Sequence, residues 1–254
     1  MHKFFVNKND INGDSAVISG DDVKHIYKVL RLQVGDKVNI NNCEGEEFLG
    51  EIEEINKRQV IVKFIKKLPL NNESNVEVYL FQGLPKSAKM DLIVQKTTEL
   101  GVKEVTPIVT ERVVVKNELG EFKKIDRWCR IALEACKQSK RSLVPKINTP
   151  IEFQSLLEVL KQMDLIVVPY ENAEGYGIKK VVNNIDKDSI KKIGIIIGPE
   201  GGFEESEIEA LEKLGAHIVT LGPRILRTET AGFVCMSLLM YELGDLGGKA
   251  LNEL

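Results

Sequence analysis

From Val76 onward, the sequence alternates between short apolar runs and longer stretches with helical periodicity. The apolar runs have the length of β-strands, and they read VEVYLFQGL, EVTPIVT, DLIVVPY, KIGIIIGP and AHIVTLG. The helical stretches cover residues 89–101, 124–141, 151–163, 204–215 and 229–244. Strands that are apolar on both faces are typical of a parallel sheet with helices on both sides. This alternation therefore predicts an α/β domain in the second part of the chain.

The first 68 residues follow a different pattern. Short β-leaning runs are separated by turn-forming residues, and they read KFFV, AVIS, KVNINN, EFLGEIEEI and QVIVKFIKK. One helical insert, SGDDVKHIYKVLRL, interrupts them. Many short strands in a short segment predict a small β-barrel. The stretch LPLNNESN then reads as a linker, so we predict two domains, residues 1–70 and residues 76–254.

The charged residues are spread unevenly along the chain. The formal net charge of the 254 residues is only −3, which indicates neither a disordered nor a strongly basic protein. Residues 71–150 carry 14 basic and 10 acidic groups, whereas residues 151–254 carry 10 basic and 17 acidic groups. A polyanionic partner is therefore expected at the middle third of the chain, the only part with a net positive charge.

No pattern in the sequence points to a metal site or to a membrane. The four cysteines, Cys43, Cys129, Cys136 and Cys235, form no C-x-x-C pair, and there are only three histidines. This usage suits buried thiols in a reducing compartment. The N-terminus lacks the apolar segment of a signal peptide, and no apolar run reaches the length of a membrane span. We expect a soluble, cytoplasmic protein without a metal and without a membrane partner.

A glycine-rich loop follows the apolar run that ends near residue 197. The sequence GPEGG, residues 198–202, stands where α/β sheets bind ligands, and its glycines let the backbone approach a ligand closely. The loop matches neither G-x-G-x-x-G nor the Walker A pattern. Three carboxylates near the start of the next helix, Glu200, Glu204 and Glu205, also repel phosphate. A neutral or cationic ligand is therefore favoured.

A second irregular loop, LGPRILRTETAG, covers residues 221–232 and follows the next strand. It contains a Gly-Pro turn, two arginines and a Thr-Glu-Thr sequence where the last helix would begin. Two irregular loops at the same end of a sheet can form two sides of one pocket. Taken singly, each loop has an ordinary alternative, because Gly-Pro pairs form turns and Thr228 or Thr230 can cap a helix.

These two loops resemble the signature loops of the RsmE family, the bacterial 16S rRNA uridine-N3 methyltransferases. Other segments resemble the family in the same order along the chain, and they read HIYKVLRLQVGD, LPKSAKMDLIVQKTTELGV, RWCRIALEACKQSKRSLVP and VVPYE. The resemblance implies an N-terminal PUA-like β-barrel that binds RNA, and a C-terminal SPOUT domain, an α/β fold whose parallel sheet contains a trefoil knot. It also implies S-adenosylmethionine as cofactor, 16S rRNA or the 30S subunit as partner, and a homodimer.

The resemblance assigns cofactor binding to three segments. S-adenosylmethionine has no phosphate and carries a sulfonium cation, which agrees with an acidic, glycine-rich loop. The residues carried over are Glu171 after the third apolar run, Gly198, Pro199, Glu200, Gly201 and Gly202 in the first loop, and Leu221, Gly222, Ile225, Leu226 and Arg227 in the second loop. Glu171 has an ordinary alternative as a solvated loop carboxylate.

Methylation of uracil at N3 requires the hydrogen on N3 to leave, and the resulting negative charge spreads onto the flanking carbonyl oxygens. A guanidinium close to these oxygens would stabilise the charge. We expect Arg227 or Arg224 to serve in this way, with Arg227 preferred because it stands beside Thr228 and Glu229. Glu229 could accept the proton, or it could orient Arg227 or interact with the helix N-terminus.

Two basic surfaces are candidates for RNA binding. The helical stretch 124–141 has an apolar stripe, and the basic residues opposite it are Arg127, Arg130, Lys137 and Arg141. The helical insert of the first domain presents Lys24, His25, Lys28 and Arg31. Lys86 and Lys89 are two further candidates. Any of these groups could instead belong to an ordinary solvated face.

Two functions from other classes compete with this interpretation. The first is a catalytically inactive SPOUT-like protein that binds rRNA through its barrel, and the two intact loops argue against it. The second is an α/β enzyme that acts on a small anionic metabolite, for which a separate barrel domain would have no evident use.

Overall fold

The computed structural model describes residues 1–69, 72–86, 89–113 and 124–248. It divides into two compact units, the first made of Met1–Glu73 with Cys136–Val144 and the second made of Ser74–Ala135 with Pro145–Leu254. Each unit has its own sheet and its own hydrophobic core. Ser87 and Ala88, in a segment that resembles the family, lie outside the described residues, as do residues 249–254 at the end of the expected second domain.

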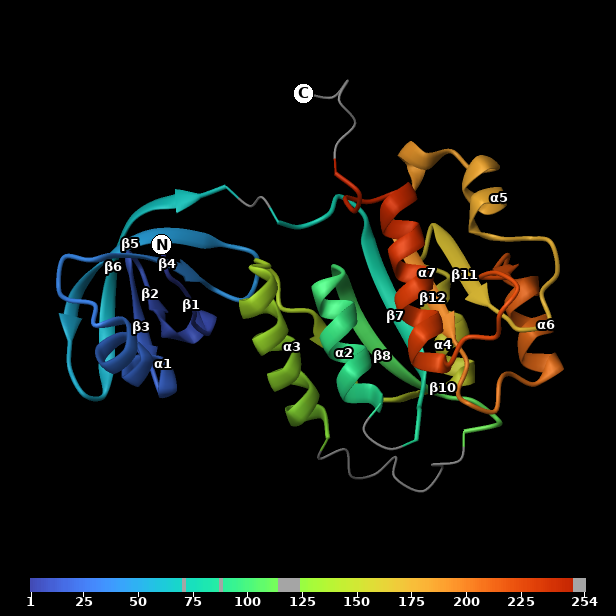
Figure 1. The fold of residues 1–254 in the computed structure, drawn as a ribbon, viewed down its shortest axis with the longest axis horizontal. Helices are drawn as coiled ribbons and strands as arrows, with labels where there is room; N and C mark the ends of the chain where they lie inside the picture. Colours follow the sequence, from blue (N-terminus) through green and yellow to red (C-terminus); the bar gives the residue numbers. More distant parts are fainter. Residues whose placement is uncertain (70–71, 87–88, 114–123, 249–254) are drawn as a thin grey trace. The chain divides into compact units, whose positions relative to one another are not determined.

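The first unit contains a six-stranded sheet in the order β1-β4-β5-β6-β3-β2. Its strands are β1 (Lys3–Phe5), β2 (Ile11–Asn12), β3 (Ser15–Ser19), β4 (Lys37–Asn41), β5 (Glu47–Ile55) and β6 (Gln59–Leu68). Only β1 and β4 pair in parallel, and the sheet curls on itself (Figure 1). Alternate residues such as Ile52, Val60 and Val62 are fully buried in the core, as expected for strands with one apolar face. The predicted small β-domain is therefore confirmed.

The helical insert of this unit combines two kinds of turn. One α-helical turn, α1 (Asp21–Lys24), continues into a π-helical turn over His25–Leu30, and the chain then reverses at Arg31 with φ 53°. Val23 and Ile26 of the insert are buried in the core of the first unit. The candidate RNA-binding residues of the insert are all exposed, and they are Lys24, His25, Lys28 and Arg31.

The first unit differs from the predicted range 1–70 because residues 136–144 belong to it. The carboxylate of Glu73 accepts hydrogen bonds from the backbone N–H groups of Ser142 (2.7 Å) and Leu143 (2.9 Å). Asn41, which is fully buried, donates from Nδ2 to the carbonyl of Ser142 at 3.0 Å. These bonds join residues about 70 to 100 positions apart. Local sequence patterns therefore predict two contiguous domains. They do not show that residues 136–144 belong to the first unit.

The second unit contains a seven-stranded sheet in which every pair of neighbours is parallel. The strand order is β10-β8-β7-β12-β11-β13, and β9 pairs with β8 outside this path. The strands are β7 (Glu77–Gly83), β8 (Val102–Val109), β9 (Lys146–Ile147), β10 (Ile151–Glu152), β11 (Leu165–Pro169), β12 (Lys192–Ile197) and β13 (His217–Val219). The predicted α/β architecture is confirmed. The sequence pattern missed the two short strands β9 and β10.

Helices cover both faces of this sheet. On one face, α2 (Lys89–Glu99) and α7 (Thr228–Glu242) contact each other and strands β7, β8 and β12, and α5 (Ile178–Asn183) contacts α7. On the other face, α4 (Phe153–Leu160) and α6 (Glu205–Lys213) bury leucines against Phe81, Ile108 and Ile196 of the sheet. The remaining helix is α3 (Ile125–Ser139). Because β7 and β12 lie at the centre, their carboxyl ends open between the two helical layers.

Two expectations about the chain as a whole can be compared with the structure. All four cysteines are free, but only Cys136 and Cys235 are buried, whereas Cys43 is half-buried and Cys129 is exposed. The expectation of four buried thiols is therefore wrong for two of them. Among the residues in the described ranges, no helix is long and apolar enough to cross a membrane.

Candidate active site

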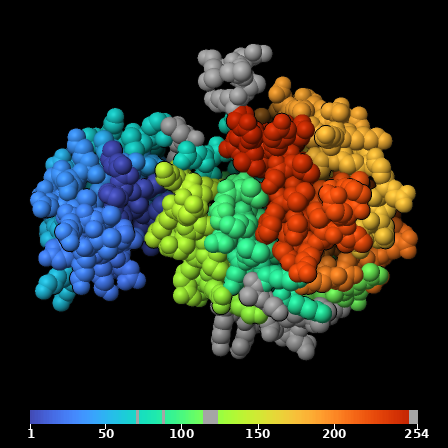
Figure 2. All heavy atoms as spheres, in the orientation of Figure 1, coloured from blue at the N-terminus to red at the C-terminus, as the bar shows by residue number. Residues whose placement is uncertain are grey.

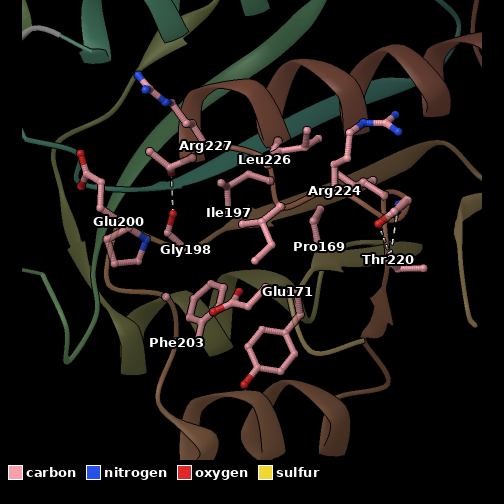
Figure 3. A pocket seen from close by; sticks show the side chains of 18 of the residues that line it. Pro169, Glu171, Ile197, Gly198, Glu200, Phe203, Thr220, Arg224, Leu226 and Arg227 are labelled. Carbon is pink, nitrogen blue, oxygen red and sulfur yellow. Dashed lines mark hydrogen bonds between the residues drawn. The ribbon is translucent and has the colours of Figure 1, made fainter. Parts of the chain in front are cut away.

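A pocket of about 600 Å³ lies at the carboxyl ends of β11, β12 and β13, beside the first turn of α7. The structure thus brings the two irregular loops of the sequence together (Figure 3). Of the expected cofactor-binding residues, those that line the pocket are Glu171, Gly198, Pro199, Glu200, Gly202, Leu221, Gly222, Ile225, Leu226 and Arg227. Lining residues that the sequence reading did not include are Pro169, Tyr170, Ile197, Phe203, Thr220, Pro223, Thr228 and Ala231.

The first loop turns sharply before α6. Gly202 has φ +72°, and its N–H donates to the carbonyl of Pro199 at 3.0 Å, which closes the turn. A Cβ atom at Gly202 would lie 2.7 Å from Oε1 of Glu171, the far end of a flexible side chain, so it is mainly the positive φ value that favours glycine here. Glu171 follows β11 and therefore faces the loop from a neighbouring strand end. This close approach places the two expected segments on one side of the pocket.

Gly201 is the one expected cofactor residue that does not line the pocket. A Cβ atom on it would lie 3.0 Å from Cβ of Arg112 and 3.2 Å from the Arg112 carbonyl oxygen. Arg112 donates to the Gly201 carbonyl at 3.2 Å and pairs with both carboxylate oxygens of Glu204, at 2.7 and 3.1 Å. The turn at Gly202 directs Gly201 toward Arg112, so the geometry does not favour Gly201 as a cofactor residue.

The second loop forms the opposite wall. Thr220 fixes its start, because its hydroxyl accepts from the N–H of Gly222 at 3.1 Å and lies 3.1 Å from the carbonyl of the same residue. Gly222 has φ +126°, a backbone conformation that residues other than glycine rarely adopt. Both candidate catalytic arginines line the pocket, but at different ends. In Figure 3, Arg227 lies on the side of Glu200 and Gly198, whereas Arg224 lies on the side of Thr220.

Lys89 connects the two loops at the Arg227 end of the pocket. Its Nζ lies 3.0 Å from Oε1 of Glu200 and 3.4 Å from Oε2 of Glu229. The hydrogen bond from Lys89 to Glu200 raises the pKa of the ammonium above its ordinary value. Burial alone would raise the pKa of Glu200, but hydrogen bonds from Lys89 and from backbone N–H groups, including that of Lys86, outweigh it and lower the pKa. Lys89 therefore lies within the pocket as a partner of two carboxylates.

Glu229 stands behind this ion pair and does not line the pocket. Its side chain is only 12% exposed. The contact with Lys89 has the distance of an ion pair without the angle of a hydrogen bond, so Oε2 accepts no hydrogen bond from the described part of the chain. Arg227 therefore borders the cavity directly, whereas Glu229 does not.

Three residues of the site gave no clear functional signal in the sequence. Thr228 was expected at most to cap α7, but its hydroxyl donates to the carbonyl of Gly198 at 2.6 Å. Gln82, at the end of β7, donates to that same hydroxyl at 2.8 Å. A Cβ atom on Gly83 would lie 2.4 Å from the nitrogen of Pro199. The sequence did contain one signal for Gln82 and Gly83: a polar residue followed by glycine at the end of an apolar strand indicates a close approach of another segment.

The basic residues of α3 fall into two groups. Arg127 is exposed and pairs with Asp91, and Arg130 is exposed and donates to the carbonyl of Asp126 at 3.2 Å. Lys137 is half-buried and lies 3.5 Å from Asp22. Arg127 and Arg130 thus keep an exposed position on the helix.

Arg141 does not share this exposed position. The helix ends at Ser139, and Lys140 reverses the chain with φ +60°. Arg141 is then only 4% exposed, and its guanidinium donates to Glu73 at 2.7 and 3.2 Å. The structure therefore does not favour a contact between Arg141 and RNA, because its charge is buried against a carboxylate within the first unit.

No group of three or more histidine, cysteine, aspartate or glutamate side chains is arranged for metal binding in the ranges that the structure describes. The pocket's polar groups include backbone amides, two arginines, one lysine, two carboxylates and the hydroxyls of a tyrosine and two threonines. This set can hold a small polar ligand with a positive charge and can stabilise an anion at either arginine.

Two family models match the chain. A model described as RNA methyltransferase domain matches residues 72–240, and a model described as RNA methyltransferase PUA domain matches residues 18–65. The first match contains every residue of the pocket. Together they confirm the predicted fold class, a SPOUT-type methyltransferase domain preceded by a PUA-like domain.

Curated relatives cover almost the whole chain. A protein from Bacillus subtilis named ribosomal RNA small subunit methyltransferase E is 37% identical over 91% of this chain and 91% of its own length. A protein of the same name from Mesomycoplasma hyopneumoniae is 34% identical over 93% of this chain and 98% of its own length.

Solved structures show the same architecture with a ligand. A protein from Legionella pneumophila, solved with the bound cofactor SAM, is 31% identical with a TM-score of 0.80, and the match covers 96% of this chain and 98% of that one. Ribosomal RNA small subunit methyltransferase E from Neisseria gonorrhoeae, bound to S-adenosyl methionine, is 28% identical with a TM-score of 0.79, covering 97% and 99% of the two chains.

Proposed function

This chain belongs to the ribosomal RNA small subunit methyltransferase E family, and on that premise we propose that it transfers a methyl group from S-adenosylmethionine to N3 of one uridine in 16S rRNA. Membership makes the protein an S-adenosylmethionine-dependent rRNA methyltransferase. The observation that carries the proposal is the pocket that both signature loops build at the strand ends. Methylation at N3, rather than at another atom of the nucleotide, is the finer part of the proposal.

The residues present suit S-adenosylmethionine in both shape and charge. The backbone of Gly198, Gly202 and Gly222 offers close approach without side chains, and the apolar side chains of Ile225 and Leu226 lie beside it. Carboxylates of Glu171 and Glu200 border the cavity, which favours a cation and disfavours a phosphate. We assign the cofactor to the ten lining residues of the expected set and leave Gly201 out.

The bound cofactor supplies an activated methyl group, so the task of the chain is to position the uracil and to manage the N3 proton. We assign the stabilisation of charge on the uracil oxygens to Arg227, which lines the pocket beside Glu200. Arg224 is the second candidate, at the opposite end. Glu229 is assigned to proton acceptance or to the orientation of Arg227, and Lys89 holds its carboxylate in place.

We propose that RNA binds to exposed basic residues of both units, with 16S rRNA or the 30S subunit as the partner. In the first unit these are Lys24, His25, Lys28 and Arg31. In the second unit they are Lys86, Arg127 and Arg130, and the half-buried Lys137 of the first unit is a weaker candidate. Lys89 is assigned to the pocket because two carboxylates already surround it.

The RNA assignment predicts a change in salt dependence. The Arg127→Ala, Arg130→Ala double variant should bind RNA more weakly, and the slope of log affinity against log salt should shrink by about 0.7 for each phosphate that the variant no longer neutralises. Affinity for S-adenosylmethionine should stay unchanged. The measurement is a filter-binding titration of an rRNA fragment at several salt concentrations, with Lys161→Ala, an exposed lysine directly after α4, as the matched control. A double variant whose slope equals that of wild type would contradict the assignment.

We also propose that the protein is a homodimer that pairs through α2 and α7. These helices pack against each other, and their outer side carries the exposed side chains of Leu92, Leu238 and Tyr241 (α2 green and α7 red in Figure 2). Apolar side chains at such spacing on a helix normally face another protein surface. The trefoil knot remains a prediction from the resemblance, and a cytoplasmic location remains a prediction from the sequence pattern.

The dimer proposal predicts that charge on this surface separates the subunits. The Leu238→Glu, Tyr241→Glu double variant should sediment as a monomer at concentrations where wild type sediments as a dimer, because two desolvated carboxylates cannot be paired there. Analytical ultracentrifugation measures this directly. The exposed Val29→Glu substitution in the first unit is the control and should leave the dimer intact. If the double variant is still a dimer, the interface must lie on a surface other than that of α2 and α7.

The function is tested by methyl transfer followed by mapping of the product. The protein is incubated with labelled S-adenosylmethionine and either deproteinised 16S rRNA or 30S subunits, and the modified nucleotide is identified by mass spectrometry. We expect one N3-methyluridine in 16S rRNA. Binding of both cofactor and rRNA without transfer would favour the inactive rRNA-binding alternative, and methylation of a ribose or of another base would contradict the N3 assignment.

A further inference from the structure

We propose that Gln82 is a positioning residue of the cofactor site: its buried amide orients the hydroxyl of Thr228, which holds the Gly198 carbonyl and so ties the two pocket loops together. The proposal rests on the proposed function in one respect, that S-adenosylmethionine is the ligand of the pocket. Gln82 itself does not line the pocket, so its effect on the ligand passes through Thr228 and Gly198.

The chain of contacts begins at the centre of the sheet. Gln82 lies in β7, is fully buried, and is the direct neighbour of Ile197 in β12. Its Nε2 donates to Oγ1 of Thr228 at 2.8 Å, and Oγ1 of Thr228 donates to the carbonyl of Gly198 at 2.6 Å. The dashed line at Gly198 in Figure 3 marks this second bond. Gly198 opens the first loop, and Thr228 lies in the second loop, where it is the first residue of α7.

The direction of these bonds depends on Gln82. A threonine hydroxyl has one hydrogen to donate and lone pairs that accept. Because the Nε2 group of Gln82 can only donate, it occupies a lone pair of Thr228 and leaves the single hydrogen for the carbonyl of Gly198. The peptide that joins Gly198 to the rest of the first loop is thereby fixed in one orientation relative to α7.

The amide oxygen of Gln82 supports a role of this side chain in orienting Thr228. Its Oε1 is buried and accepts no hydrogen bond from the residues that the structure describes, and an unpaired buried oxygen lowers stability. Leucine would fill similar space at the end of an apolar strand without that cost. The donor end of the amide makes its contacts with Thr228 and with the Gly83 carbonyl, both at the base of the pocket. The amide of Gln82 therefore contributes to the geometry of the cofactor pocket and not to the stability of the strand.

The test compares variants that keep or remove the hydroxyl and the amide. Thr228→Val and Gln82→Leu should each weaken S-adenosylmethionine binding about tenfold or more, the effect of losing one buried hydrogen bond and leaving its partner unpaired. Thr228→Ser keeps the hydroxyl and should stay within about threefold of wild type. Thr230→Val removes a hydroxyl in the same helical turn, outside the pocket, and is the matched control. Binding is measured by calorimetry, and folding by thermal melting.

The two positions should also act as one unit. In the Gln82→Leu, Thr228→Val double variant, affinity should fall little further than in Thr228→Val alone, because the first substitution acts through the second. Equal affinity of Thr228→Val and Thr228→Ser, or losses that multiply in the double variant, would overturn the proposal. A wild-type protein that binds no S-adenosylmethionine would instead overturn the proposed function, so the two failures are distinguishable.

Discussion

Replacing Arg227 with alanine is expected to slow single-turnover methylation about 100- to 1,000-fold, the usual effect of removing one donor that stabilises developing charge. Affinity for S-adenosylmethionine and for rRNA should change far less, because the guanidinium acts mainly on charge that appears as the N3 proton leaves. Arg227→Lys should recover only part of the rate, since an ammonium keeps the charge but loses the planar pair of donors. Higher pH should partly rescue both variants, because it favours the deprotonated uracil.

The measurement is a single-turnover time course with saturating cofactor across a pH series, for wild type, Arg227→Ala and Arg227→Lys. Arg224→Ala is the matched comparison, because Arg224 lines the same pocket at its other end. A normal rate in Arg227→Ala together with weakened rRNA binding would move Arg227 from catalysis to phosphate binding. Arg224 would then be the candidate for charge stabilisation.

Gly83→Ala is expected to abolish measurable S-adenosylmethionine binding, a loss of about 100-fold or more, although Gly83 does not line the pocket. The added methyl carbon would lie 2.4 Å from the nitrogen of Pro199 and 2.8 Å from the carbonyl carbon of Gly198. These are backbone atoms, which cannot rotate away as a side chain can. The first loop would have to move off the end of β7, and the pocket wall would move with it.

Gly232→Ala is the matched control for this substitution. Gly232 lies in α7 near the same network, but a methyl group there would meet Oε1 of Gln82 at 3.5 Å and Cγ1 of Ile197 at 3.8 Å, which are ordinary contacts. Cofactor binding should persist, and the thermal midpoint should rise because alanine favours a helix over glycine by about 1 kcal/mol. Both variants are compared by calorimetry with S-adenosylmethionine and by circular dichroism. Normal binding in a folded Gly83→Ala protein would show that the loop does not depend on this contact.

The sequence predicted the elements of the fold well because its periodic patterns are local. The apolar runs that became β7, β8, β11 and β12 have strand length and lie between amphipathic helices, so their parallel pairing follows from general rules. The sequence could not reveal that residues 136–144 join the first unit, because the hydrogen bonds that hold them there reach Glu73, about 70 positions away. Other hydrogen bonds to the same Glu73 carboxylate explain why Arg141, which follows α3, is buried.

For the site, too, the sequence predicted some features and missed others. Resemblance placed both loops on the pocket, but it could not separate Gly201 from Gly202, since their roles depend on which peptide takes the positive φ value. Gln82 and Lys89 act through partners more than 100 positions away, which no local pattern contains. Lys89 therefore read as a solvated or RNA-binding charge until the structure placed it between Glu200 and Glu229.

We propose that the pocket between residues 198–202 and 221–227 holds S-adenosylmethionine. A crystal structure of the protein grown with S-adenosylmethionine is the decisive measurement. We expect density for the cofactor in that pocket, with backbone groups of both loops in contact with it. Density in another cavity, which is lined by Thr110 and Phe153, or an empty pocket at saturating cofactor would overturn the assignment.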